Sequence, residues 1–268
     1  MSNFLIFFKG IFVGVANVIP GLSGGTVAVI LGIYEQLIRS LSNILKCRYD
    51  MFKVSFVFLS LIMAGALVGV FSFSFLIDWL LLNFNEPLTY FFIGVLISSV
   101  PYIVKKKSVQ LFKLPNIFIC FIFVIVGFFL IFLKDFMTVN SDLETVSQSY
   151  LFLSSFIAAA TMIIPGVSGS LVLVLFGTYS YVILAIKAID ITVLSIVSIA
   201  SFFGILSTSF VIKKALDNYF QFTMSAIIGL MVGTIPGLYV GFSSILIVYN
   251  FVFFVVGLSL VWFLDYIN

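Results

Sequence analysis

Residues 19–41 read IPGLSGGTVAVILGIYEQLIRSL, an apolar stretch that is interrupted near its start by proline, glycine and serine. Residues 164–186 read IPGVSGSLVLVLFGTYSYVILAI, and 10 of the 23 aligned positions are identical in the two stretches. The identities include a Pro-Gly-x-Ser-Gly core and a later Gly-x-Tyr. Two copies of one broken apolar segment indicate an internal repeat, and this repeat decides the fold.

The similarity between the two halves continues beyond these stretches. Residues 69–101 align without a gap with residues 204–236. Identical residues at aligned positions include Gly69 and Gly204, Gly94 and Gly229, Pro101 and Pro236, and, in a later segment, Gly127 and Gly257. We therefore predict two repeats, residues 1–140 and residues 141–268, that together form one integral membrane domain.

The amino-acid composition excludes a soluble globular protein. Of the 268 residues, 63% are hydrophobic and 9% are charged, whereas soluble domains carry about 25% charged residues. The 34 phenylalanines need an apolar surrounding, which lipid supplies. We therefore predict an all-α polytopic membrane protein.

The chain contains no histidine. This absence excludes Ser-His-Asp and Cys-His catalysis as well as His-ligated zinc. We therefore expect no enzymatic activity, no metal and no cofactor. Basic runs such as residues 105–107 are typical of topology signals that also contact anionic lipid, and we expect no binding to nucleic acid.

Apolar runs of roughly 20 residues can cross the hydrocarbon layer of a membrane. Each repeat has three such runs after its broken segment: residues 54–77, 88–104 and 114–133 in the first repeat, and residues 191–212, 223–242 and 244–264 in the second. The arms of the broken segments are too short to cross alone. We predict that these segments form re-entrant helical hairpins over residues 4–38 and residues 149–186.

The basic residues predict which side of the membrane each loop faces. If both hairpins are re-entrant, 11 of the 13 Lys and Arg residues fall on one side and 2 on the other. If each hairpin instead crosses once, the division is 9 to 4. The positive-inside rule favours the first arrangement, with both termini in the cytoplasm. Three crossings in each repeat place the second repeat upside down, an architecture typical of secondary transporters with a binding site near the midplane.

The hairpin breaks are candidate sites for an anionic ligand. Pro20 ends the incoming helix, and we expect Ser23 and Thr26 to cap an outgoing helix over residues 26–38. A helix N-terminus inside the membrane presents N–H and hydroxyl groups that suit a phosphate. The alternative, ordinary Pro-Gly kinks at a helix crossing, stays open for one copy, but two copies favour a functional site. The predicted phosphate-binding residues are Gly21, Ser23, Gly24, Gly25, Thr26, Arg39, Gly166, Ser168, Gly169 and Ser170, and the predicted coupling or gating residues are Asn17, Pro20, Glu35 and Pro165.

Charged side chains near the first break are the other candidates. Glu35 and Arg39 are four residues apart, so they share a helix face on which they can pair. Arg39 either contacts an anionic head group or extends to the membrane interface, and Glu35 either carries a proton or neutralises Arg39. Lys9 is expected to extend to the interface.

The segments GVANVIPGLSGGTVAVILGIYE and IPGVSGSLVLVLFGTY resemble the bacterial polyprenyl-phosphate transporter family, and the resemblance covers essentially the whole chain. It implies a protein of the bacterial plasma membrane that moves undecaprenyl phosphate from the outer to the cytoplasmic leaflet, so that the lipid carrier is reused in cell-envelope synthesis. The family pattern has Asp where this chain has Asn17, which makes Glu35 the stronger candidate for coupling. The motif positions that match are Pro20, Gly21, Ser23, Gly24, Gly25, Thr26, Glu35, Pro165, Gly166, Ser168, Gly169 and Ser170.

The main alternative function is secondary transport of a small soluble anion. Such a transporter would use the same helix ends but needs a watery pore, and the spans contain few polar residues to line one. The sequence leaves open whether a proton or a sodium ion is coupled to transport. It also leaves open whether the protein forms a homo-oligomer.

Overall fold

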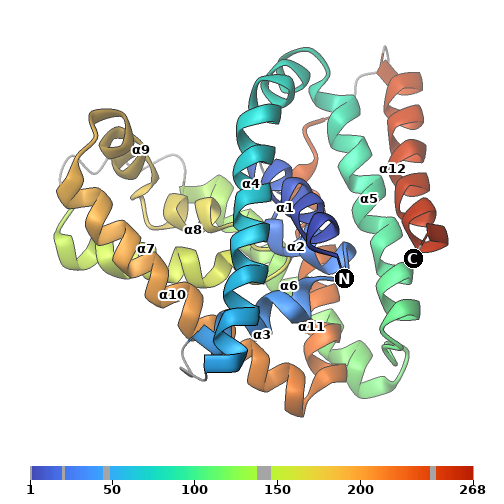
Figure 1. Ribbon diagram of the computed structural model, residues 1–268. Helices are drawn as coiled ribbons and strands as arrows, with labels where there is room; N and C mark the ends of the chain where they lie inside the picture. The colour runs from blue at the N-terminus through green and yellow to red at the C-terminus, as the bar shows by residue number, and fades with distance from the viewer. Residues whose placement is uncertain (1, 20–21, 45–48, 138–145, 242–245, 268) are drawn as a thin grey trace.

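In a computed structural model of the chain, every regular element among the described residues is helical (Figure 1). The structure describes residues 2–19, 22–44, 49–137, 146–241 and 246–267. The first half contains α1 Asn3–Val18, α2 Gly24–Ile30, α3 Tyr34–Ile44, α4 Tyr49–Asn83, α5 Asn85–Lys106 and α6 Leu114–Met137. The second half contains α7 Gln148–Met162, α8 Gly169–Leu175, α9 Tyr179–Ala188, α10 Ile191–Asn218, α11 Phe220–Gly233, the 3-10 helix η1 Ile235–Leu238 and α12 Ile247–Ile267.

Several of these helices are long and apolar enough to cross a membrane. Within the described residues, five segments meet this requirement: α4, α5, α6, α10 and the combined segment Phe220–Leu238 of α11 and η1. The bent pair α8 and α9 would bring the number to six if it counted as one span. The chain is therefore a multi-pass helical membrane protein, as the composition predicts.

The fifth predicted span, residues 223–242, is present but begins and ends earlier, as Phe220–Leu238. Its α-helix ends at Gly233, and the chain continues through η1 only as far as Leu238. Pro236 lies in that 3-10 turn, whereas the aligned Pro101 lies inside the continuous helix α5. The part of this prediction beyond residue 241 lies outside the described residues.

The predicted continuous helix over residues 26–38 is also wrong, because the outgoing arm of the hairpin breaks a second time. Helix α2 ends at Ile30, Gly32 has a φ of 70°, and α3 begins at Tyr34. In the second half, Gly177 has a φ of 67°, and the axes of α8 and α9 differ by 110°. The repeated Gly-x-Tyr therefore marks a left-handed glycine that ends a helix, rather than a glycine inside one.

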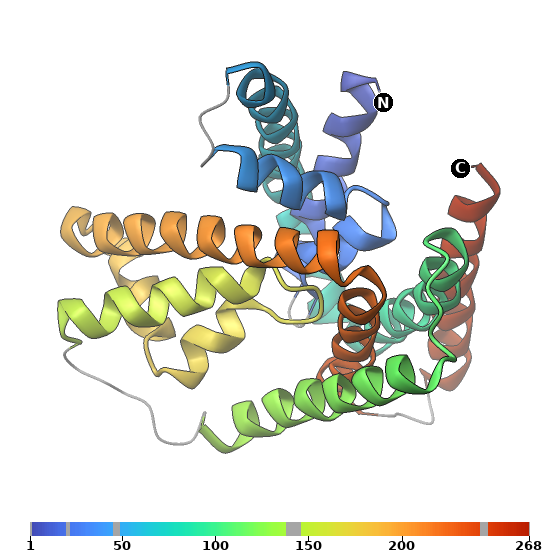
Figure 2. The same cartoon turned by 90° about the horizontal axis from the view of Figure 1, so that it is seen from below.

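The same helix pairs form in both halves of the chain. Helix α1 packs along α4, and the corresponding α7 packs along α10. The last helices are exchanged between the halves, since α12 packs along α5 and α6 packs along α11. The pair α5 and α12 stands side by side in Figure 1, and α7 lies beside α10 in Figure 2. The repeat found in the sequence thus corresponds to a repeated pattern of packing.

Glycines at aligned positions allow these close crossings. A Cβ on Gly69 in α4 would clash with a backbone carbonyl of α1, and a Cβ on Gly204 in α10 would clash with one of α7. Gly94 and Gly229 play the same role where α5 meets α12 and where α11 meets α6. Small residues at such crossings let helix backbones approach closely inside a membrane, where van der Waals packing drives association.

We expect Gly69→Leu and Gly204→Leu to destabilise the fold, because either side chain would force two backbones apart. Overpacking of this kind costs about 1–3 kcal/mol or more. The measurement is thermal unfolding of purified protein in detergent micelles. Phe71→Leu, at an exposed position of α4 two residues away, is the matched control. Equal unfolding temperatures for Gly69→Leu and Phe71→Leu would contradict this account of the crossings.

Candidate functional site

The two copies of the Pro-Gly-x-Ser-Gly motif contact each other. The backbone N–H of Gly166 donates to the Oγ1 of Thr26 over 2.8 Å. A Cβ on Gly25 would lie 3.0 Å from the carbonyl oxygen of Ile163, so the two copies pack closely at this point. The hairpin tips, which are 140 residues apart in the chain, therefore form one region of the structure.

In the described part of the first copy, residues 22–26, side chains accept from the backbone N–H groups of Gly24 and Gly25. Ser23 is the N-cap of α2, as predicted, and its Oγ accepts from the N–H of Gly25 over 3.2 Å. The Oδ1 of Asn17 accepts from the N–H of Gly24 over 3.1 Å. The side chains of Ser23 and Thr26 are almost fully buried, at 4% and 2% exposure. Asn17 therefore serves as a second cap of α2 in this structure.

Thr26 differs from its prediction, because it does not cap α2. It lies inside that helix, and its hydroxyl instead accepts the hydrogen bond from the second copy. Two other predicted residues, Pro20 and Gly21, lie outside the described residues.

The second copy of the motif is more open. Ser168 occupies the N-cap position of α8 but makes no side-chain capping bond. Its hydroxyl lies 2.7 Å from that of Ser170, which is exposed. Pro165 is fully buried, and Gly166 has a φ of 88° and lies directly against the backbone of α11. Gly169 packs in a similar way against α7. This copy thus presents hydroxyl groups on a backbone that its neighbours hold in place.

Lys9, which we expect to extend to the membrane interface, has a specific backbone partner. Its Nζ donates to the carbonyl oxygen of Leu31 over 2.7 Å, at the point where α2 ends. A carbonyl at the end of a helix has no partner within that helix, and lipid offers none. The ammonium group therefore supplies the hydrogen bond that the second break in the hairpin requires.

Glu35 and Arg39 do not pair with each other. Glu35 instead binds Lys107, with 2.6 Å between its Oε1 and the lysine Nζ. Arg39 binds Asp217 in α10 over 2.9 Å, and Lys213 lies 3.7 Å from the same aspartate. The packing of α3 against α10 brings Arg39 to Asp217, and Glu35 finds its partner at the end of α5.

Sequence reasoning also missed a polar pair between α5 and α12. Asn250, at 2% exposure, donates from its Nδ2 to the Oε2 of Glu86 over 3.1 Å, and its Oδ1 is buried without a partner. An amide in an otherwise apolar helix was the available signal, because polar side chains in spanning helices usually bind each other. Lys107 and Asp217 gave no such signal, since loop charges are common.

The fold and the meeting of its two motif copies define a helical, multi-pass membrane protein with a candidate site between two broken hairpins. Residues 13–250 match a family described as undecaprenyl phosphate translocase-like. The chain belongs to this family, which confirms the resemblance seen in the two motifs.

Two characterised relatives cover most of the chain. A polyprenyl-phosphate transporter of Vibrio cholerae is 30% identical over 246 residues, which are 88% of this chain and 77% of the relative. A polyprenyl-phosphate transporter of Staphylococcus aureus is 32% identical over 265 residues, which are 93% of this chain and 91% of the relative. No solved structure matches the chain significantly.

Replacing Thr26 tests the contact between the motif copies. Thr26→Val keeps the shape of the side chain but leaves the N–H of Gly166 without an acceptor. A donor left unsatisfied in this way costs about 1–3 kcal/mol, so the variant should unfold at a lower temperature in detergent. Thr26→Ser retains the hydroxyl and is the matched control. If Val and Ser destabilise the protein equally, the hydrogen bond does not hold the two tips together.

Proposed function

We propose that this protein moves a polyprenyl phosphate, such as undecaprenyl phosphate, from the outer to the cytoplasmic leaflet of the bacterial plasma membrane. Membership of the translocase-like family and the names of both relatives support this substrate. The observation that carries the proposal is the hydrogen bond from Gly166 to Thr26. It brings both motif copies into one region, where a single phosphate head group can reach both hairpins.

We further propose that the repeats have inverted topology, with both termini in the cytoplasm. The division of 11 basic residues on one side and 2 on the other supports this orientation. The equivalent helix pairs of the two halves support a structural repeat. In this arrangement the hairpins enter from opposite sides, so their tips meet inside the membrane, where secondary transporters bind their substrates.

The phosphate binds first at the second motif copy. The hydroxyls of Ser168 and Ser170 are accessible there, and hydroxyls are good donors to a phosphate. The N–H groups of the first copy already bind Asn17 and Ser23. Helices α2 and α8 have only seven residues each, so their dipoles are small. The hydroxyl groups therefore contribute more to phosphate binding than the dipoles of these two helices. The prenyl chain stays in lipid beside the repeats.

Arg39 and Glu35 take part in gating. The pair of Arg39 with Asp217 joins α3 to α10 of the second repeat, so the first hairpin cannot rock against the second repeat until this pair opens. The pair of Glu35 with Lys107 holds α3 to the chain that follows α5 within the first repeat. Released from Asp217, the Arg39 guanidinium can receive the phosphate at the cytoplasmic end. Glu35 already has a cationic partner, so it serves the gate rather than the transfer of a proton.

Ser168→Ala/Ser170→Ala should slow the movement of a fluorescent polyprenyl phosphate between leaflets of proteoliposomes by at least about tenfold. Each hydrogen bond to a charged group contributes about 1.5–3 kcal/mol, and the variant removes two donors. Ser259→Ala, an exposed hydroxyl in α12, is the matched control and should transport like the wild type. The measurement is the rate at which the label becomes inaccessible to an added quencher.

The same vesicles separate lipid transport from transport of a soluble anion. Inorganic phosphate in large excess should leave the rate of lipid movement unchanged. Uptake of radiolabelled phosphate by these vesicles without lipid movement would overturn the proposal and support the small-anion transporter.

Arg39→Gln and Asp217→Asn distinguish a head-group contact from a gate. If Arg39 receives the phosphate, Arg39→Gln should lower the transport rate about tenfold, whereas Asp217→Asn should leave it within about twofold, since partly exposed ion pairs are weak. The measurement is the leaflet-exchange rate in proteoliposomes. Equal effects of both substitutions would show that Arg39 acts only through its ion pair with Asp217.

A further inference from the structure

The second break of the first hairpin, between α2 and α3, lies beside the end of α5. Helix α2 contacts α5, and Glu35, just after the break, binds Lys107, just after α5. Gly32, in the break itself, is exposed, and a Cβ built on it would meet nothing within 4 Å. Open space therefore adjoins the backbone at the point where the hairpin breaks.

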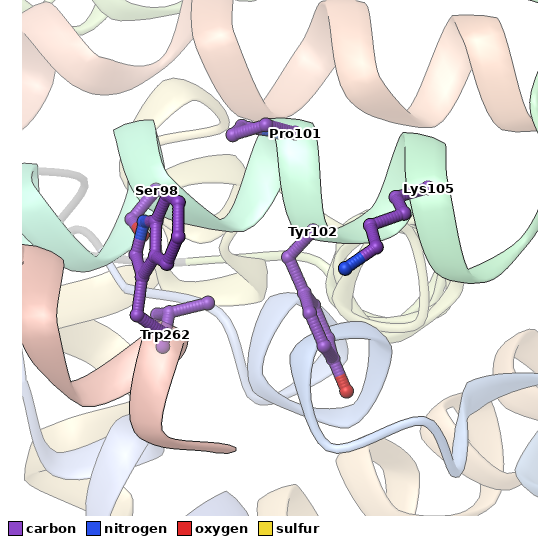
Figure 3. Close-up of a pocket in the computed structure, with 6 residues that line it drawn as sticks. Ser98, Pro101, Tyr102, Lys105 and Trp262 are labelled. Atoms are coloured by element: carbon purple, nitrogen blue, oxygen red, sulfur yellow. The ribbon is translucent and has the colours of Figure 1, made fainter. Parts of the chain in front are cut away.

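Two ammonium groups at this junction have neutral hydrogen-bond partners. The Nζ of Lys9 donates to the carbonyl oxygen of Leu31 over 2.7 Å, at the end of α2. The Nζ of Lys106 donates to the Tyr102 hydroxyl over 2.9 Å and lies 5.1 Å from the centre of its ring. Tyr102 lines a cavity of about 140 Å³ between α5 and α12, and Figure 3 shows its side chain extending from α5 with the hydroxyl at the far end. A carbonyl and a phenol thus hold the two ammonium groups in place without cancelling their charge.

These two positive charges lie near each other. Lys106 is close enough to Lys9 for the two ammonium groups to repel each other, and Lys9 is partly buried. Repulsion between like charges is stronger in such a place than in bulk water. An ammonium group has three N–H donors, and the carbonyl or the phenol takes one of them. An anion between the two lysines would replace their repulsion by two attractions and accept from the N–H groups that remain.

We propose that Lys9 and Lys106 bind a phosphate group beside the second break of the first hairpin. A phosphate monoester carries up to two negative charges and three strong acceptor oxygens, which match two ammonium groups. The open space at Gly32 leaves room for it. The phosphate belongs either to the transported lipid or to free inorganic phosphate, because both offer the same chemistry to these lysines.

The place of this site in transport rests on the proposed function. In the proposed orientation the end of α5 faces the cytoplasm, where Arg39 receives the phosphate once it leaves Asp217. Lys9 and Lys106 add a second cationic contact at this end, and neither residue belongs to a motif copy. Lys107 is already bound to Glu35 and is not part of the site.

Equilibrium binding to purified protein in a nonionic detergent tests the two lysines. The probes are radiolabelled inorganic phosphate and radiolabelled farnesyl phosphate, a short polyprenyl phosphate. Both are measured in the Ser168→Ala/Ser170→Ala background, which removes the hydroxyl donors of the second motif copy. Lys9→Gln and Lys106→Gln should each weaken the binding of at least one probe by at least about tenfold, because each removes a charged hydrogen-bond donor.

Matched variants separate a phosphate site from general surface charge. Lys113→Gln, at an exposed position after α5, should bind both probes within about twofold of its parent, and Lys9→Arg, which keeps the charge, should retain binding. Lys106→Gln leaves the Leu31 carbonyl with its partner, so it decides the question if Lys9→Gln does not fold.

The two probes also identify the source of the phosphate. A loss confined to farnesyl phosphate assigns the site to the transported lipid, and a loss confined to inorganic phosphate assigns it to the soluble anion. Unchanged binding of both probes in Lys106→Gln, or an equal loss in Lys113→Gln, would overturn the proposal. Leaflet exchange by the protein with both serines intact reports the proposed transport separately.

Discussion

Lipid offers no hydrogen-bond partner, so each backbone group exposed where a helix breaks inside the membrane must find one in the protein. This requirement governs both hairpins. The N–H groups at the start of α2 bind Asn17 and Ser23. The Lys9 ammonium group donates to the carbonyl of Leu31 at the end of α2. The Thr26 hydroxyl accepts from the Gly166 N–H of the second hairpin. These side chains supply the partners that the proposed position of the broken segments at membrane depth would require.

These supporting side chains belong to the first copy alone. In the alignment of the two halves, Lys9, Asn17 and Thr26 correspond to Ser154, Met162 and Leu171, and none of these three can replace the interaction. The second hairpin therefore depends on the first for the acceptor of its Gly166 N–H. The two copies share the Pro-Gly-x-Ser-Gly residues at which the helices break. They differ in the side chains that form hydrogen bonds with the backbone at those breaks. This difference leaves the Ser168 hydroxyl without a capping bond, which supports the proposed binding of the phosphate at the second copy.

The sequence predicts the features of the fold that repeat at a fixed spacing. Apolar runs locate the helices α4, α5, α6 and α10, and the two motif copies locate the hairpins. Prediction from the sequence fails for contacts between residues that are distant in the chain. Helix spacing allows Glu35 to pair with Arg39, yet its partner Lys107 is 72 residues away. Likewise, the glycine of Gly-x-Tyr is compatible with a helix in sequence, and only its positive φ reveals the second break.

The magnitude of the ion pairs on α3 is consistent with the proposed gate. Their side chains are partly exposed, with 54% and 37% for Arg39 and Asp217 and 29% and 28% for Lys107 and Glu35. Pairs of this kind contribute about 0.2–1 kcal/mol each, so together they favour the closed end by at most about 30-fold. Thermal motion or a bound phosphate can overcome such a bias. The aligned residues of the second copy, Ser180 and Leu184, cannot form the corresponding ion pairs. This asymmetry between the two copies supports the proposal that the pairs on α3 bias the cytoplasmic end toward closure.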